Sequence, residues 1–128
     1  MIGRVAGTEC PALGDQSPIP EGIRAVDAVL HGAKGLAVAP DGVLYVADTD
    51  ADIVRSIGLD GRIRTVAGIA HHHGGSLGNT PATRLHLFVP VGLAVGPDGM
   101  LYIGGDNQAF GGKVYRVDAR SGEIELFA

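Results

Sequence analysis

The feature that most constrains the fold of this chain is an internal repeat. Residues 35–42 read GLAVAPDG and residues 92–99 read GLAVGPDG, so seven of the eight positions agree at an offset of 57 residues. The match continues through VLYVAD at 43–48 and MLYIGG at 100–105. Because repetition at a fixed spacing is the signature of an architecture built from repeated structural units, we expect two copies of one unit.

Each unit is predicted to fold as a meander of four short strands. Alternating apolar segments are joined by turns such as Pro-Asp-Gly at 40–42, where Pro and Gly favour a change of chain direction. The leading residues 2–6, IGRVA, align with the fourth strand of the unit. They predict a fourth strand that is not preceded by the first three strands of its own unit. The eight other predicted strands lie at 35–39, 43–47, 52–57, 62–67, 91–95, 100–104, 113–117 and 123–127.

Two long loops separate the predicted strands, at 8–34 and 69–91. In the second loop, Thr80 and Pro81 are expected to begin a helical turn over 81–87, because Pro is favoured at the first position of a helix. The chain is therefore divided into a leading strand with its loop, a first unit with its loop, and a second unit, at 1–34, 35–91 and 92–128.

Four-stranded antiparallel units in tandem are typical of β-propeller blades. The predicted fold class is all-β, a β-propeller fragment of about two four-stranded antiparallel blades plus one leading strand. Exposure of Leu36 or Leu93 would contradict this interpretation, because the first two strands of a blade lie nearest the propeller axis. The alternating residues predicted to be buried on these strands are Leu36, Val38, Leu44, Val46, Leu93, Val95, Leu101 and Ile103.

Composition excludes several classes of protein. Hydrophobic residues make up 45% of the chain and support a packed core, and the net charge of −4 without basic clusters argues against nucleic-acid binding. No apolar run approaches the roughly 18 residues that span a membrane. Cys10 is the single cysteine, so no internal disulfide is possible. No signal peptide is recognised, so we expect a cytoplasmic protein if the chain is complete and an extracellular one if it is a fragment of a secreted protein.

Two segments resemble NHL repeats of the kind found in bacterial NHL proteins and the teneurin propeller. They read PATRLHLFVPVGLAVGPDGMLYIGG at 81–105 and AVDAVLHGAKGLAVAPDGVLYVADT at 25–49. The resemblance implies part of a propeller of about 4–8 blades and a module for protein interaction. The sequence departs from the repeat pattern after each Leu-Tyr pair, at residues 50–53 and 104–106.

Two blades cannot close a propeller ring, so the chain is expected to be a truncated part of a larger propeller or to assemble one from several copies. The expected partner is a protein, or another copy bound through exposed blade edges, and neither nucleic acid nor membrane. Residues 2–6 are expected to pack along an edge of the chain's own blades or to pair with a neighbouring copy. They are not expected to fill the fourth-strand position of the second blade.

The favoured function is therefore a non-catalytic binding scaffold. The alternative is a portion of a metal-dependent propeller enzyme, similar to gluconolactonases or amidating lyases, in which several blades supply the metal ligands. A third possibility is a gene fragment without an independent function. No catalytic residue is predicted, because the chain lacks a nucleophile motif such as G-x-S-x-G.

The strongest candidate binding motif is Asp48-Thr-Asp50-Ala-Asp52. Alternating carboxylates suit a hard cation such as Ca²⁺, although the EF-hand pattern is absent. The favoured interpretation is that Asp48 accepts backbone N–H groups within the turn at 48–52. With this motif, Asp106 and Asn107 complete the predicted binding residues.

A weaker candidate is a zinc or calcium site at His71, His73 and His86. Neighbouring histidines on extended backbone point in different directions, so a surface loop with incidental metal affinity is the favoured interpretation and no cofactor is expected. The glycine-rich stretch 104–112 lacks the pattern of a phosphate-binding loop.

Overall fold

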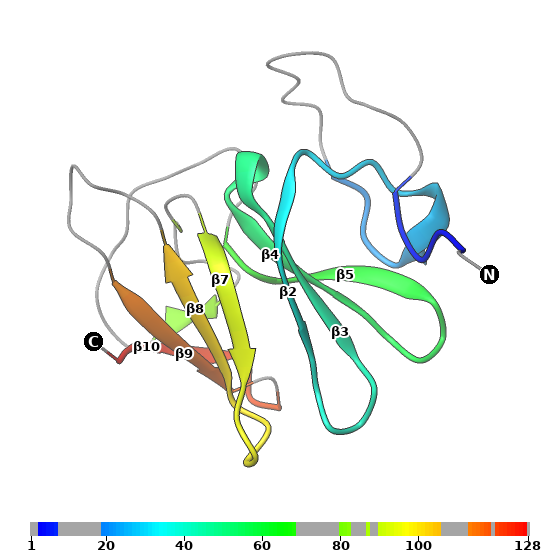
Figure 1. The fold of residues 1–128 in the computed structure, drawn as a ribbon. Helices are drawn as coiled ribbons and strands as arrows, with labels where there is room; N and C mark the ends of the chain where they lie inside the picture. Colours follow the sequence, from blue (N-terminus) through cyan, green and yellow to red (C-terminus); the bar gives the residue numbers. More distant parts are fainter. Residues whose placement is uncertain are drawn as a thin grey trace.

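Two antiparallel sheets, each of five strands, lie side by side in the computed structural model (Figure 1). The structure describes residues 3–7, 19–68, 80–82, 87, 90–105, 113–118 and 120–127. Within these residues no helix is long and apolar enough to cross a membrane. The predicted all-β propeller fragment is confirmed, with two blades that each form one sheet.

The first sheet has the order β1-β5-β4-β3-β2. Its strands are β1 (Ile23–Arg24), β2 (Ala33–Val38), β3 (Leu44–Asp48), β4 (Ile53–Ile57) and β5 (Arg62–Ala67), with short 3-10 turns η1 (Ala25–Asp27) and η2 (Thr49–Ala51). The second sheet has the order β6-β10-β9-β8-β7. Its strands are β6 (Thr80–Pro81), β7 (Pro90–Val95), β8 (Leu101–Gly105), β9 (Val114–Asp118) and β10 (Glu123–Leu126).

The Pro-Asp-Gly turns are built identically in the two blades. Asp41 Oδ1 accepts the N–H of Val43 at 3.0 Å in the first blade, and Asp98 Oδ1 accepts the N–H of Met100 at 3.0 Å in the second. The glycine that follows each aspartate has a positive φ, which favours glycine there. The repeated sequence therefore produces the repeated hairpin.

The segment before each blade contributes a short outer strand that the sequence did not predict. β1 pairs with β5 through Ile23 and Ile63, and β6 pairs with β10 through Thr80 and Ile124. Pro81 lies in β6, so the prediction that it is the first residue of a helical turn is wrong, but Ala82 directly after it has 3-10 helical conformation. Residues 83–86 of that predicted turn lie outside the described residues.

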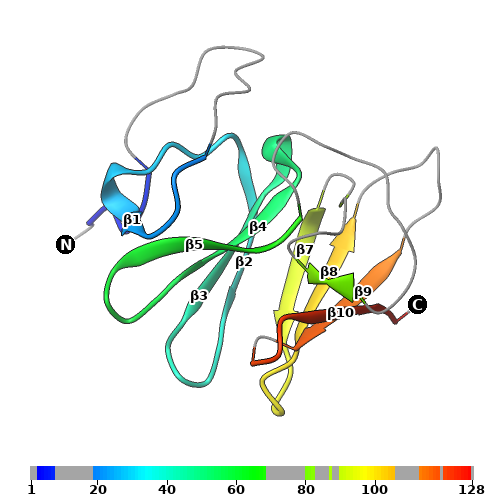
Figure 2. The ribbon, with the colours of Figure 1, turned by 180° about the vertical axis from the view of Figure 1, so that it is seen from behind.

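The main core lies between the sheets, where β2 and β7 run beside each other (Figures 1 and 2). Side chains from the two facing surfaces interleave there, as expected for stacked sheets. Its buried members are Ala39, Tyr45, Val54, Ala67, Ala82, Leu87, Leu101, Ile103, Val117 and Ile124. A smaller core covers the opposite face of the first sheet and consists of Ala25, Ala28, Val46, Ile57 and Ile63.

The predicted burial of the eight alternating strand residues is correct for some of them. Val46, Leu101 and Ile103 are buried, and Leu44, Leu93 and Val95 are partly buried.

Leu36 and Val38, however, are 64% and 68% exposed, so their predicted burial is wrong. They pair with Val46 and Leu44, and therefore point to the face of the first sheet that lies away from the second. The second sheet covers only the other face. The expectation that an exposed Leu36 would contradict the blade interpretation is also wrong, because the blade forms with this side chain uncovered.

The leading segment packs against the first blade. Ala6 contacts the smaller core, and the N–H of Gly7 donates to the carbonyl of Ala25 at 3.0 Å. This is one of the two predicted arrangements, although residues 3–7 form no ladder with another described strand. β10 takes the fourth-strand position of the second blade, as expected.

Candidate binding surface of the first blade

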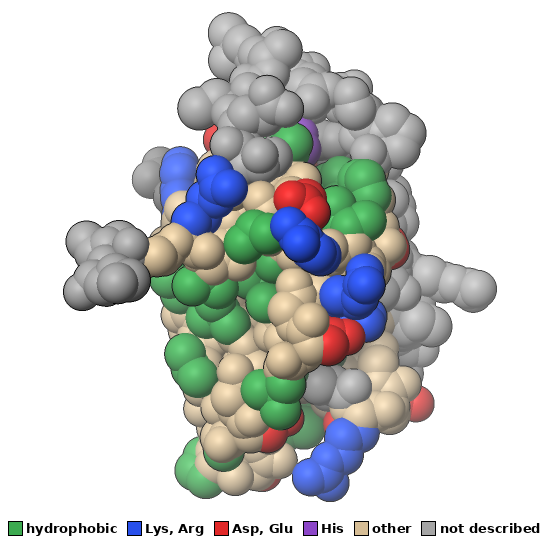
Figure 3. Space-filling model, turned by 90° about the vertical axis from the view of Figure 1, so that its right-hand side faces the viewer, with side chains coloured by type: hydrophobic (Ala, Val, Ile, Leu, Met, Phe, Trp, Pro, Cys, Tyr) green, Lys and Arg blue, Asp and Glu red, His purple; other side chains and the backbone are tan. Residues whose placement is uncertain are grey.

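The candidate binding surface is the outward face of β2 at the edge of the first sheet. Leu36 and Val38 project from it, two residues apart and therefore on the same side of the strand. Figure 3 views the molecule from the side of the first blade and shows hydrophobic side chains exposed among Lys, Arg, Asp and Glu side chains. An uncovered apolar strip with charged surroundings is the usual appearance of a protein contact surface.

A buried arginine lies farther across the same face. Arg55 pairs with Val46 in the ladder and is 1% exposed. Its Nη2 donates to the carbonyl of Pro20 at 2.9 Å and lies 3.7 Å from Oε1 of Glu21. Burial lowers the pKa of Arg55, and the negative charges of Glu21 and Asp48 oppose that shift. The guanidinium remains charged, because arginine is not deprotonated in proteins.

Asp48 is fully buried beside this arginine. Its Oδ1 accepts the backbone N–H of His31 at 2.6 Å, and its Oδ2 lies 3.7 Å from Nδ1 of His31. The prediction that Asp48 accepts N–H groups within 48–52 is therefore wrong. Burial raises the pKa of Asp48, while the His31 N–H and the charge of Arg55 act in the opposite direction.

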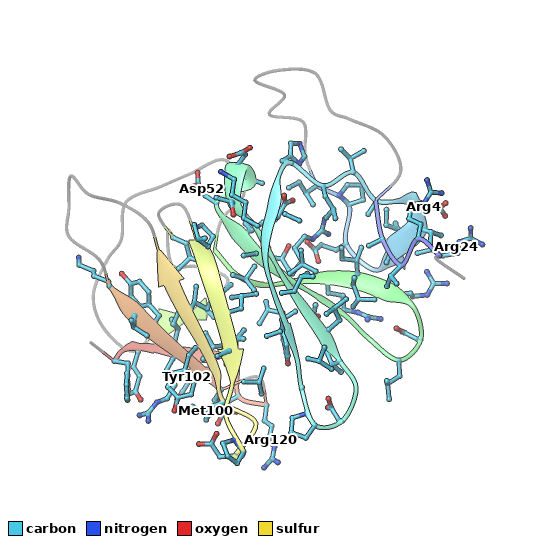
Figure 4. The ribbon with its side chains drawn as sticks, viewed as in Figure 1. Arg4, Arg24, Asp52, Met100, Tyr102 and Arg120 are labelled. Atoms are coloured by element: carbon cyan, nitrogen blue, oxygen red, sulfur yellow. The ribbon has the colours of Figure 1, made fainter. Side chains whose placement is uncertain are left out.

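The three carboxylates of the Asp-x-Asp-x-Asp motif have different surroundings. Asp50 is exposed and lies against Gly32, where a Cβ would be 2.5 Å from Oδ2. Asp52 is 6% exposed and has left-handed backbone with φ of 60° at the end of η2 (Figure 4). The described residues contain no group of three His, Cys, Asp or Glu side chains able to hold a metal ion.

The remaining candidate residues fall outside the described part of the chain. They are Cys10, His71, His73, His86, Asp106 and Asn107.

One polar group was not predicted from the sequence. It joins the buried Asp48 and Arg55 to His31 and to the half-exposed Glu21. One signal was available, because the strand pattern places Arg55 between Ile53 and Ile57 on one face. An arginine flanked by isoleucines on one strand face indicates a buried charge that needs partners. No sequence signal could identify Pro20 and Glu21 as those partners, or His31 as the partner of Asp48.

The second blade presents a different outward face, around Tyr102 (Figure 4). The rings of Tyr102 and Phe127 meet edge to face with centroids 5.3 Å apart. The guanidinium of Arg116 lies 5.3 Å from the Phe127 ring centroid and forms an ion pair with Glu125. This cluster closes the outer part of the face, while Ala94 on β7 stays exposed.

The fold and the repeated hairpins define a pair of β-propeller blades. A family model described as the teneurin NHL domain matches residues 2–77, which is more than half of the chain. The chain therefore belongs to the teneurin NHL family.

Two curated relatives support this assignment. The chain is 35% identical to mouse Teneurin-3 over 106 residues and 33% identical to zebrafish Teneurin-3 over 94 residues. These alignments cover 73% and 64% of this chain. The chain spans about 4% of the length of either relative.

A solved structure shows a similar fold. A protein of unknown function from Bacteroides thetaiotaomicron superposes with a TM-score of 0.64 at 19% identity, covering 92% of this chain and 26% of that protein. A virginiamycin B lyase from Staphylococcus aureus has a TM-score of 0.49 at 22% identity, covering 76% of this chain and 27% of the lyase. At 19% identity the similarity to the Bacteroides thetaiotaomicron protein concerns the fold alone.

Proposed function

We propose that this chain is a non-catalytic binding scaffold, which supplies two blades of an NHL propeller and binds protein through the outward face of β2. The observation that carries the proposal is the difference between two equivalent positions. Leu93 of the second blade packs against the main core, whereas Leu36 of the first blade is 64% exposed. The same repeat surface is thus used for packing in one blade and left open in the other.

The chemistry of this surface favours a protein partner. Leu36 and Val38 provide apolar contact, and covering such side chains contributes roughly 25 cal/mol per Å² of apolar area. β2 is also the edge strand of its sheet, so its position allows another chain to lie alongside. The charges of Asp48 and Arg55 are buried within the fold and are therefore not available to a ligand at this surface.

Site-specific photo-crosslinking tests this proposal in the full protein. A photoreactive amino acid at Val38 is expected to form an adduct with protein, identified by mass spectrometry of the crosslinked peptides. The matched control is the same group at Leu59, which is 78% exposed but lies in the turn between β4 and β5. Equal adduct formation at both positions, or none at Val38, would contradict a binding role for this face.

A further inference from the structure

We propose that the outward face of β2 binds the outward face of the second blade of another copy of this chain, head to tail. This proposal rests on the binding role of β2 and names its partner. The contact would reproduce between two copies the packing that the first blade makes with the second blade within one copy.

The two open faces match the two halves of the internal interface. On the receiving side, Leu36 and Val38 repeat Leu93 and Val95, which contact the main core. On the other side, the surface that the first blade turns toward the second contains Ala37 paired with Tyr45, and Ala47 paired with Val54. The equivalent pairs on the outward face of the second blade are Ala94 with Tyr102, and Gly104 with Val114.

Gly92 provides an independent observation. Its counterpart Gly35 lies so close to the carbonyl of Val91 in the next blade that a Cβ there would overlap the oxygen. Around Gly92 a Cβ would meet nothing within 4 Å, and its φ is not in the left-handed region. Nothing in the described fold therefore requires glycine at 92, but a docked copy would, since the carbonyl of Lys34 would take the place of that of Val91.

The leading segment already occupies the position of a preceding blade's last residues. Gly7 has φ of 88° and donates to the carbonyl of Ala25 at 3.0 Å, while Gly68 has φ of 91° and donates to the carbonyl of Ala82 at 2.9 Å. A Cβ on Gly7 would touch Leu30, and one on Gly68 would touch the equivalent Leu87. Relative to the first blade, residues 3–7 thus lie where residues 64–68 lie relative to the second.

Docking requires a small movement of this segment. Residues 125–127 of the incoming copy would fall where residues 3–5 lie, because 3–5, 64–66 and 125–127 are equivalent. Residues 3–5 are exposed, and Val5 is 61% exposed, so they can turn aside without opening the smaller core. Ala6 is equivalent to Ala128 of the incoming copy, which would replace it against the smaller core, while Gly7 can keep its place.

The outer part of the two interfaces differs. Arg116 stands where the first blade has Ser56, because each is paired with the tyrosine of its sheet. Its ion pair with Glu125 of the same sheet provides the counter-charge that a covered arginine needs. The match is therefore closest on the strands nearest the propeller axis, β2, β3, β7 and β8.

Such a contact is heterologous, so it joins unlike surfaces and can extend or close into a ring. Sedimentation velocity of the whole chain over a range of concentrations is the test. The average mass of the unmodified chain is expected to rise with concentration. Leu36→Glu and Ala94→Glu should each remain monomeric, and a mixture of these two variants should form a one-to-one dimer and nothing larger, since each retains one intact face.

Two further variants sharpen the result. Leu59→Glu alters an exposed side chain outside both faces and should associate like the unmodified chain. Gly92→Ala adds one methyl group where the isolated fold has room, so it should fold normally and associate at least tenfold more weakly. Circular dichroism confirms that each variant is folded.

Several results would overturn the proposal. They are a monomeric unmodified chain at all concentrations, association of Ala94→Glu with itself, failure of the mixed variants to dimerise, or unchanged association of Gly92→Ala. A monomeric chain that still forms Val38 crosslinks to a different protein would reject self-association and retain the scaffold function. A chain that neither associates with itself nor forms Val38 crosslinks to another protein would reject both the self-association and the scaffold function.

Discussion

Thr49 of the first blade donates a hydrogen bond of 2.7 Å from Oγ1 to the carbonyl of Pro90 in the second blade. Both residues are buried, and the contact joins η2 to the first residue of β7. This hydrogen bond crosses an interface that is otherwise made mainly of apolar side chains. Loss of the Thr49 hydroxyl would leave the buried carbonyl of Pro90 without this donor.

Thr49→Val is therefore expected to lower the free energy of unfolding by about 1–2 kcal/mol, because it removes the donor and keeps the side-chain shape. Urea denaturation followed by circular dichroism measures the change. Thr65→Val is the matched control, since the Thr65 hydroxyl bonds to the exposed Glu21 and its loss should matter less. Equal effects of the two variants would show that the link between the blades contributes nothing particular.

Gly35→Ala is expected to destabilise the chain by about 2 kcal/mol, the magnitude typical of overpacking. The added methyl group must push the Val91 carbonyl away and separate β2 from β7. Chemical denaturation at low protein concentration, where copies do not associate, gives the comparison with Gly92→Ala. The second variant should be close to neutral there, and a loss as large as that of Gly35→Ala would mean that the two glycines are not distinguished by their contacts.

Asp48 is expected to make stability depend on pH in the direction opposite to that of a salt-bridged aspartate. Its pKa in the folded chain lies above the ordinary value of 3.8 because of burial. The contribution of Asp48 to the free energy of unfolding is therefore complete below pH 3.8. It is lost as the pH rises from 3.8 through the folded-state pKa, because Asp48 ionises at a lower pH in the unfolded chain than in the folded chain.

The measurement is the unfolding free energy of the unmodified chain minus that of Asp48→Asn, as a function of pH. This difference should fall as the pH rises from 3.8 and become constant above the folded-state pKa. A difference that increases with pH over this window would mean that His31 and Arg55 outweigh burial.

Arg55→Met is expected to lower the free energy of unfolding by about 2 kcal/mol or more, since it leaves the buried charge of Asp48 without its neighbouring cation. The loss should be smaller in an Asp48→Asn background, which a double-mutant cycle measures. The pH window assigned to Asp48 should also move upward, because the charge of Arg55 lowers that pKa. Additive losses in the cycle would contradict coupling between the two residues.

The strands were predictable because their signals are local. Alternation and the Pro-Asp-Gly turns locate β2 and β3, and the repeat locates β7 and β8 in the same way. β1 and β6 contain two residues each, too few to show any period. Each of them is a strand only because it pairs with the fourth strand of the blade that follows it in the sequence, β5 or β10.

Burial was less predictable than strand position. Alternation correctly placed Leu36 on the same face as Val46, but it cannot tell whether another layer covers that face. The partner of Asp48 was missed for a similar reason, since His31 lies 17 residues away and is brought near only by the fold. In the Asp-x-Asp-x-Asp motif, the turn η2 and the left-handed Asp52 send the side chains into different surroundings.

The pairing of β1 with β5 and of β6 with β10 also defines the sequence unit that must be duplicated to add a blade. A blade begins at β1, in the segment ahead of the GLAV motif, and ends at β5. Inserting a second copy of residues 23–79 would therefore add a whole blade with its own outer strand, whereas a cut at residue 34 would separate that strand from its sheet. Gene duplication or protein engineering that respects the boundary before Ile23 extends the array without leaving a broken sheet at the junction.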